Sequence, residues 1–130
     1  MKKVLILGAG LSGIGSAELA KRNSFDILLS ESNAIDAKIK SKLKKLDIEF
    51  EENSHTNAKT YSADLVIKSP GIPDESDIIN SLSKKGFSII SEIEFASLFS
   101  STPAIGVTGS NGKTTTATII HKLLSDANIN

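Results

Sequence analysis

The chain has 130 residues, with 15 basic and 15 acidic side chains and no formal net charge. This length allows one sizeable hydrophobic core. The balanced charge excludes a global field that would attract nucleic acid or an anionic membrane, so any grip on phosphate must be local. Without cysteine there are no disulfides or thiolate metal sites, and no apolar run reaches the ~18 residues of a membrane span. We therefore expect a cytoplasmic protein that binds neither nucleic acid nor membrane.

Short apolar runs alternate with helical patterns along the chain, which predicts an α/β fold with a Rossmann-like parallel sheet flanked by helices. Strands are expected at 4–7, 25–29, 48–50, 65–67, 87–90 and 105–107. Helices are expected at 14–22, 35–46, 78–82, 92–99 and 114–127, where apolar residues recur three and four apart. The polar stretch 53–62 predicts a loop or a poorly formed helix.

The last predicted strand and helix follow a short polar linker at 100–103. One strand and one helix cannot form a nucleotide-binding domain by themselves, because a strand needs neighbours to pair with. We therefore expect a Rossmann-like domain over 1–99 and the truncated start of a second α/β domain over 104–130.

The run Gly8-Ala9-Gly10-Leu11-Ser12-Gly13 follows the first predicted strand and opens the first predicted helix. This is the context of the Gly-x-Gly-x-x-Gly fingerprint, in which a phosphate group lies against a helix N-terminus. Glu31, at the end of the second strand, is placed to accept a hydrogen bond from a ribose hydroxyl or a base N–H. The pattern predicts a phosphate site without choosing NAD over another nucleotide, and a purely structural glycine turn is the alternative.

A second glycine loop, Thr-Gly-Ser-Asn-Gly-Lys-Thr-Thr-Thr, occupies 108–116. Gly109 and Gly112 would let backbone N–H groups point inward, Lys113 would hold outer phosphates, and the Thr114 hydroxyl could bind Mg²⁺. Val107 stands where the general phosphate-loop pattern has its first glycine. A strand–turn–helix junction that happens to carry a lysine is therefore the alternative.

Three further features carry polar or titratable side chains that could serve a site. The turn Ser69-Pro70-Gly71-Ile72 follows a buried strand, and its serine could bind a sugar or phosphate, the alternative being a rigid crossover turn. Glu92 and Glu94 have a sufficient structural reason as first-turn acids of a helix. Neither His55 nor His121 has a carboxylate or second histidine at ligand spacing, so both are predicted to be ordinary surface residues. We find no Ser-His-Asp arrangement and no zinc site.

Four motifs stand in one order: the glycine loop at 8–13, Ser-Pro-Gly-Ile at 69–72, Ser-Glu-Ile-Glu-Phe at 91–95 and the second glycine loop at 108–116. Together they resemble the Mur ligases of peptidoglycan biosynthesis over essentially the whole chain. The last motif is typical of the superfamily that these ligases share with folylpolyglutamate synthetases. The first two motifs favour the branch that adds D-glutamate, and a branch that adds L-alanine is the alternative.

The resemblance implies a three-domain enzyme. Its N-terminal domain would hold UDP-N-acetylmuramoyl-L-alanine, its central domain ATP and Mg²⁺, and its C-terminal domain the incoming D-glutamate. ATP would phosphorylate the substrate carboxylate, and the amine of D-glutamate would attack the acyl phosphate. The family's further magnesium carboxylate, its carbamylated lysine and its amino-acid site would lie beyond residue 130. We therefore expect this chain, as a monomer, to bind the UDP substrate without catalysing the reaction.

The resemblance also assigns roles to individual residues. Those expected to bind the UDP substrate are Gly10, Leu11, Ser12, Gly13, Glu31, Ser32 and Ser69, with Glu31 and Ser32 where the family often has aspartate and threonine. Those expected to bind ATP are Gly109, Ser110, Asn111, Gly112, Lys113, Thr114 and Thr115, with Lys113 catalytic and Thr114 on Mg²⁺. There are two competing hypotheses. One is a non-catalytic nucleotide- or partner-binding module, and the other is an NAD-dependent oxidoreductase. The oxidoreductase hypothesis gives the motif at 108–116 no role.

Overall fold

A computed structural model describes residues 2–129 of the chain. The chain divides into two compact units, Met1–Ser100 and Ser101–Asn130. The first unit contains, in order, β1 (Lys3–Leu7), α1 (Leu11–Arg22), β2 (Asp26–Ser30), α2 (Ala37–Lys45), β3 (Glu49–Glu51), α3 (Thr56–Thr60), β4 (Leu65–Lys68), α4 (Asp77–Lys84), β5 (Ile89–Ser91) and α5 (Glu92–Ser97). The second contains α6 (Lys113–Asp126).

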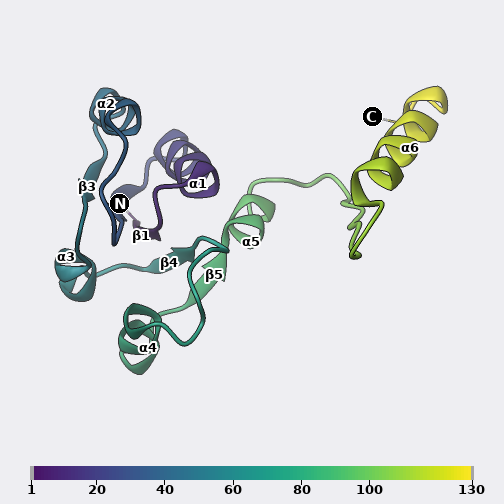
Figure 1. Ribbon diagram of the computed structural model, residues 1–130. Helices are drawn as coiled ribbons and strands as arrows, with labels where there is room; N and C mark the ends of the chain where they lie inside the picture. Colours follow the sequence, from purple (N-terminus) through teal and green to yellow (C-terminus); the bar gives the residue numbers. More distant parts are fainter. Residues whose placement is uncertain (1, 130) are drawn as a thin grey trace. The chain divides into compact units, whose positions relative to one another are not determined.

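The five strands form one parallel sheet in the order β3-β2-β1-β4-β5 (Figure 1). At its centre, Leu7 of β1 pairs with Ser30 of β2 and with Lys68 of β4. This is the strand order of the Rossmann fold, so the predicted α/β fold with a parallel sheet is confirmed. The chain leaves β1 toward one edge and returns to β4 on the other side. Ligands of such sheets bind beyond the carboxyl ends of the strands at this switch point.

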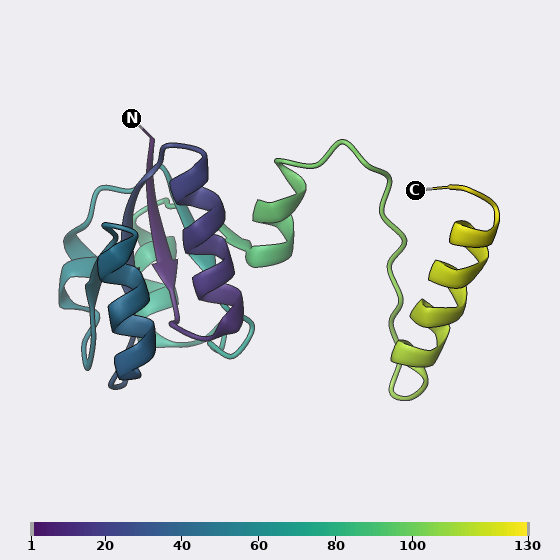
Figure 2. The ribbon, with the colours of Figure 1, turned by 90° about the horizontal axis from the view of Figure 1, so that it is seen from above.

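Helices cover both faces of the sheet (Figure 1). On one face, buried Ala17 of α1, Leu43 of α2 and Phe95 of α5 belong to one hydrophobic cluster with the strands; Figure 2 views the first unit from the side of α1 and α2. On the other face, Ala58 of α3 and Leu82 of α4 belong to a second cluster. The inner strands β1, β2 and β4 are buried on both faces, which explains why each carries a continuous apolar run in the sequence.

The polar stretch 53–62 contains a short helix, α3. Its first turn is held by the Glu51 side chain, which accepts hydrogen bonds from the N–H groups of Asn57 at 2.9 Å and Ala58 at 2.7 Å. These bonds satisfy donors that the start of a helix leaves free. The structure thus selects the helix from the two alternatives that the sequence left open.

The helix α5 begins with a capping box. The Ser91 hydroxyl accepts the Glu94 N–H at 3.2 Å, and the Glu94 carboxylate accepts the Ser91 N–H at 2.7 Å. Both Glu92 and Glu94 lie in the first turn, so their predicted structural role is confirmed. Phe95 then anchors the helix, because its ring packs edge-to-face against Phe25 at a centroid distance of 6.0 Å.

In the second unit the predicted helix is present as α6, but the predicted strand at 105–107 is wrong: residues 101–129 contain no strand. A strand requires a neighbouring strand for its backbone hydrogen bonds, and this unit supplies none. None of the residues of α6 is buried, and Ile119 and Leu123 remain 54% and 63% exposed. The apolar rows of α6 therefore have no core within the unit. Across residues 2–129, no helix combines the length and apolar character needed to cross a membrane.

Candidate functional site

A cavity of about 440 Å³ lies where β1, β2 and β4 end. The loops that follow these three strands and the first two residues of α1 supply its lining residues: Gly8, Gly10, Leu11, Ser12, Glu31, Ser32, Asn33, Ser69, Pro70, Gly71 and Ile72. The structure thus brings together six of the seven residues expected to bind the UDP substrate, although they are up to 59 positions apart (69 − 10). Gly13, the seventh, is not among the lining residues.

The glycine loop packs tightly against its neighbours. A Cβ atom on Gly13 would lie 2.0 Å from the Gly8 carbonyl oxygen, which no real contact allows. Gly8 itself has φ +100°, and a Cβ there would lie 2.7 Å from the Ser69 hydroxyl oxygen. Glycine at 13 therefore lets α1 start directly against the end of β1, whereas glycine at 8 lets the chain turn beside Ser69. Gly13 acts through packing in this structure.

The start of α1 presents free backbone donors. The first intrahelical bond runs from the Ile14 N–H to the Gly10 carbonyl at 3.0 Å, and the N-cap Gly10 has no side-chain cap. The N–H groups of Leu11, Ser12 and Gly13 precede that bond and have no partner within the helix. No acidic residue stands in the first turn. The N-terminal end of the helix dipole thus favours an anion at this wall of the cavity.

Glu31 fastens the glycine loop to the end of β2. Its Oε2 accepts the Ala9 N–H at 2.9 Å, while its Oε1 accepts the Asn33 N–H at 3.0 Å and the Ser32 hydroxyl at 3.2 Å. Partial burial raises the pKa of this carboxyl, but these hydrogen bonds outweigh burial and hold the pKa below its ordinary value. The sequence predicted a carboxylate offered to a ligand. In the structure its oxygens accept hydrogen bonds from the protein.

We expect Glu31→Gln to change how stability depends on pH. Because the folded-state pKa of Glu31 lies below its ordinary value of 4.5, the carboxylate stabilises the fold fully above that pH. The contribution is lost as the pH falls through the folded pKa. Urea midpoints should therefore favour the wild type at pH 7 and converge toward those of the variant below pH ~4. Glu75→Gln, at an exposed site outside the cavity, is the control. If the urea midpoints of the wild type and Glu31→Gln differ by the same amount at pH 7 and below pH ~4, this role of the Glu31 carboxylate is contradicted.

The second glycine loop has the backbone that its sequence predicts. Gly109 and Gly112 have φ of +145° and +75°, in the region that favours glycine. Gly112 is the N-cap of α6 and provides no side-chain cap, so the first N–H groups of this helix are also free of a capping side chain. The Lys113 ammonium folds back on the loop and donates to the carbonyls of Gly109 at 2.6 Å and Ser110 at 3.4 Å. The lysine that the sequence assigns to phosphate is thus bonded to the loop itself in this structure.

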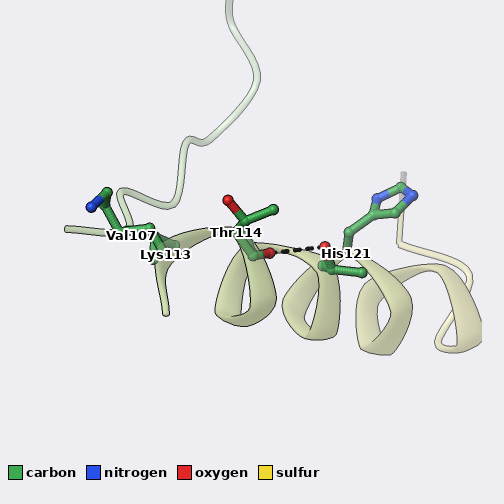
Figure 3. A pocket seen from close by; sticks show the side chains of 6 residues that line it. Val107, Lys113, Thr114 and His121 are labelled. Carbon is green, nitrogen blue, oxygen red and sulfur yellow. Dashed lines mark hydrogen bonds between the residues drawn. The ribbon is translucent and has the colours of Figure 1, made fainter. Parts of the chain in front are cut away.

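A hollow of about 500 Å³ lies beside this loop. It is lined by Val107, which precedes the loop, and by Lys113, Thr114, Ala117, Thr118 and His121 of α6 (Figure 3). The Thr118 hydroxyl donates to the Thr114 carbonyl at 2.8 Å, whereas the Thr114 hydroxyl is the oxygen ligand expected for Mg²⁺. Within residues 2–129, no group of three His, Cys, Asp or Glu residues is placed to hold a metal ion. The groups that this loop could offer to a ligand are therefore backbone amides, the Lys113 ammonium and the Thr114 hydroxyl.

The structure reveals a polar network that sequence reasoning missed. The buried Ser30 hydroxyl lies 2.7 Å from Glu51 Oε1 and 2.6 Å from His55 Nδ1. The prediction that His55 is an ordinary surface residue is therefore wrong, because its ring is half-buried and hydrogen-bonded. In a catalytic triad the histidine stands between serine and acid, whereas here the serine stands in the middle and is inaccessible. The network holds β2, β3 and α3 together, and no spacing in the sequence indicates it.

The chain is similar to known proteins both in sequence and in fold. The family model of the MurD N-terminal domain matches residues 3–78. A UDP-N-acetylmuramoylalanine–D-glutamate ligase of Christiangramia forsetii is 53% identical over 99% of this chain, and one of Bacteroides fragilis is 46% identical over all of it. A crystal structure of a murein peptide ligase from Psychrobacter arcticus aligns with 98% of the chain at a TM-score of 0.71 and 26% identity, covering 27% of that chain.

This chain spans 29% of the length of each of the two ligases. The family model matches more than half of the chain, and it includes the glycine loop after β1, Glu31 and the turn after β4. These are the elements that form the cavity at the carboxyl ends of the strands. The resemblance seen in the four sequence motifs is confirmed, and the chain belongs to the MurD N-terminal domain family.

Proposed function

We propose that this chain is the UDP-substrate-binding part of an ATP-dependent ligase that adds D-glutamate to UDP-N-acetylmuramoyl-L-alanine. The observation that carries the proposal is the cavity beside the free first-turn amides of α1, in a chain of the MurD N-terminal domain family. The names of the relatives support the substrate and the amino acid. The second unit would begin the ATP-binding domain of the complete enzyme.

In the cavity, the N–H groups of Leu11 and Ser12 would bind the diphosphate. The uracil end would lie toward Ser32, beside Glu31, and the Ser69 hydroxyl would bind the sugar. Glu31 is the one charged residue among those that line the cavity, and it is an anion. An anionic ligand would therefore be bound by helix amides and the helix dipole rather than by lysine or arginine at the cavity wall.

In the second glycine loop, the backbone from Gly109 to Gly112 would surround the phosphates of ATP, with Thr115 beside them. Bound ATP would supply the phosphoryl group that activates the substrate carboxylate. Lys113 would exchange its bonds to the loop carbonyls for a phosphate oxygen and neutralise charge there, and Thr114 would hold Mg²⁺. The phosphoryl transfer itself would require the rest of the ligase.

Calorimetry of the 130-residue chain with UDP-N-acetylmuramoyl-L-alanine tests the binding function. We expect saturable heat with one site per chain. A folded chain that shows no heat at millimolar ligand would overturn the proposal. A fluorescence titration with NADH is the matched control, since binding of NADH would instead favour the oxidoreductase. With the full-length ligase, ADP release should require D-glutamate and should not occur with L-alanine in its place.

A non-catalytic module that ends with α6 is the second candidate. It requires a stable last helix, whereas α6 has no buried residue within its unit. Amide exchange across residues 113–127 separates the two: rapid exchange supports the start of a larger domain, and slow exchange supports the module. For the ligase we further propose a cytoplasmic location, since both proposed ligands, ATP and a UDP-linked sugar, are soluble nucleotides. We also propose that it acts as a monomer.

A further inference from the structure

The last residue of β4, Lys68, has a side chain that turns back over the loop that follows it. Its ammonium lies 2.6 Å from the Asp74 carboxylate and donates to the Ile72 carbonyl at 2.9 Å. The side chain is only 19% exposed, whereas that of Asp74 is 85% exposed. Lys68 itself does not line the cavity, but the four residues that follow it, Ser69 to Ile72, all do. Lys68 thus connects the beginning and the end of one cavity wall.

One of the four residues of this wall, Pro70, has no backbone N–H, and a second proline, Pro73, follows directly after the wall. Within the turn, the Ile72 N–H bonds the Ser69 carbonyl at 3.1 Å, and the Ser69 N–H bonds the Leu7 carbonyl of β1 at 3.1 Å. The ammonium of Lys68 donates to the Ile72 carbonyl at 2.9 Å, at the end of the turn. A charged donor forms a stronger and shorter bond than a neutral one.

The ion pair with Asp74 does little for global stability, since pairs with one exposed partner contribute little. The position of this ion pair instead suggests an effect on the shape of the turn at 69–72. The turn that it holds presses the Ser69 side chain against Gly8, where a Cβ would meet it at 2.7 Å. A shift of the turn would therefore change both the wall and the glycine loop, where the free amides lie.

We propose that Lys68 is a positioning residue, which holds the Ser69–Ile72 turn in the shape that receives the anionic UDP substrate. The binding part of this inference rests on the proposed function. The ammonium acts through the Ile72 carbonyl and does not contact the ligand. A substitution that keeps the aliphatic stem and removes the charged donor should loosen the turn and leave the rest of the fold intact.

The test compares Lys68→Met, Lys68→Arg and the control Lys84→Met, at an exposed site on α4 away from the cavity. Calorimetry with UDP-N-acetylmuramoyl-L-alanine should show affinity about tenfold weaker for Lys68→Met, the effect of losing one charge-assisted hydrogen bond. Lys68→Arg should restore affinity to within about twofold, because its guanidinium can donate to both partners. Urea midpoints of all variants should stay close to that of the wild type.

Amide exchange provides the second measurement. In Lys68→Met without ligand, the amides of Gly71 and Ile72 should exchange faster, while those of α1 should not change. If the wild type binds and Lys68→Met binds within twofold of it, or if Lys68→Arg is as weak as Lys68→Met, the inference is wrong. If the wild type does not bind, the proposed function fails, and unchanged exchange at Gly71 and Ile72 would then overturn the role of Lys68 in the turn.

Discussion

Gly13→Ala is expected to lower the free energy of unfolding by about 3 kcal/mol or to prevent folding, the upper range for overpacking a buried site. The new methyl group would lie 2.0 Å from the Gly8 carbonyl oxygen and 3.0 Å from its carbon. Both are backbone atoms just after the end of the central strand β1, so no side-chain rotation can make room. The start of α1 would have to move away from the sheet. Urea unfolding followed by circular dichroism measures the loss.

Gly15→Ala is the matched control on the same helix. A Cβ on Gly15 would meet no atom within 4 Å, and the residue is exposed. Alanine in a helix interior is favoured over glycine, so this variant should gain about 0.5–1 kcal/mol. The two substitutions thus have the same chemistry and opposite expected signs. A similar gain at both positions would show that helix propensity, and not the contact with Gly8, governs the effect of alanine in this helix.

Ser12→Asp is expected to weaken the binding of UDP-N-acetylmuramoyl-L-alanine about 100-fold, if the proposed function holds. The substitution would place a carboxylate against the diphosphate, and two like charges ~4 Å apart repel by several kcal/mol at the effective dielectric of a protein surface. The fold should not suffer, because an acidic residue in the first turn of a helix stabilises it by about 0.5 kcal/mol. Affinity and stability should therefore change in opposite directions, which calorimetry and urea unfolding together detect.

Ser12→Asn has the shape of the aspartate variant without its charge, and it should bind within about threefold of the wild type. The difference between the two variants should shrink in high salt, because salt screens exposed charges. An unchanged affinity in Ser12→Asp would show that the glycine loop is not the ligand site. A similar loss in both variants would assign the effect to side-chain size.

Local patterns predicted most of the first unit. The apolar run at 65–67 became a strand buried in the sheet because a parallel strand covered on both faces is apolar throughout. The glycine spacing at 8–13 predicted a strand–turn–helix junction, because a tight turn from a strand into a helix requires glycine within a few residues of the strand end. The network of Ser30, Glu51 and His55 could not be predicted in this way. Glu51 and His55 lie 21 and 25 residues after Ser30, and no helical or strand periodicity in the sequence links the three positions.

The sequence by itself determined the order of strands and helices in the first unit and the two glycine loops, because both depend on residues that are neighbours along the chain. Only the tertiary structure decided which residues line the cavity, that Gly13 is required by the Gly8 carbonyl, and that Glu31 bonds the loop rather than facing a ligand freely. It also showed that residues 105–107 form no strand within the described chain. An apolar run becomes a strand only when another strand satisfies its backbone hydrogen bonds, and that condition is met by partners in space rather than by the run itself.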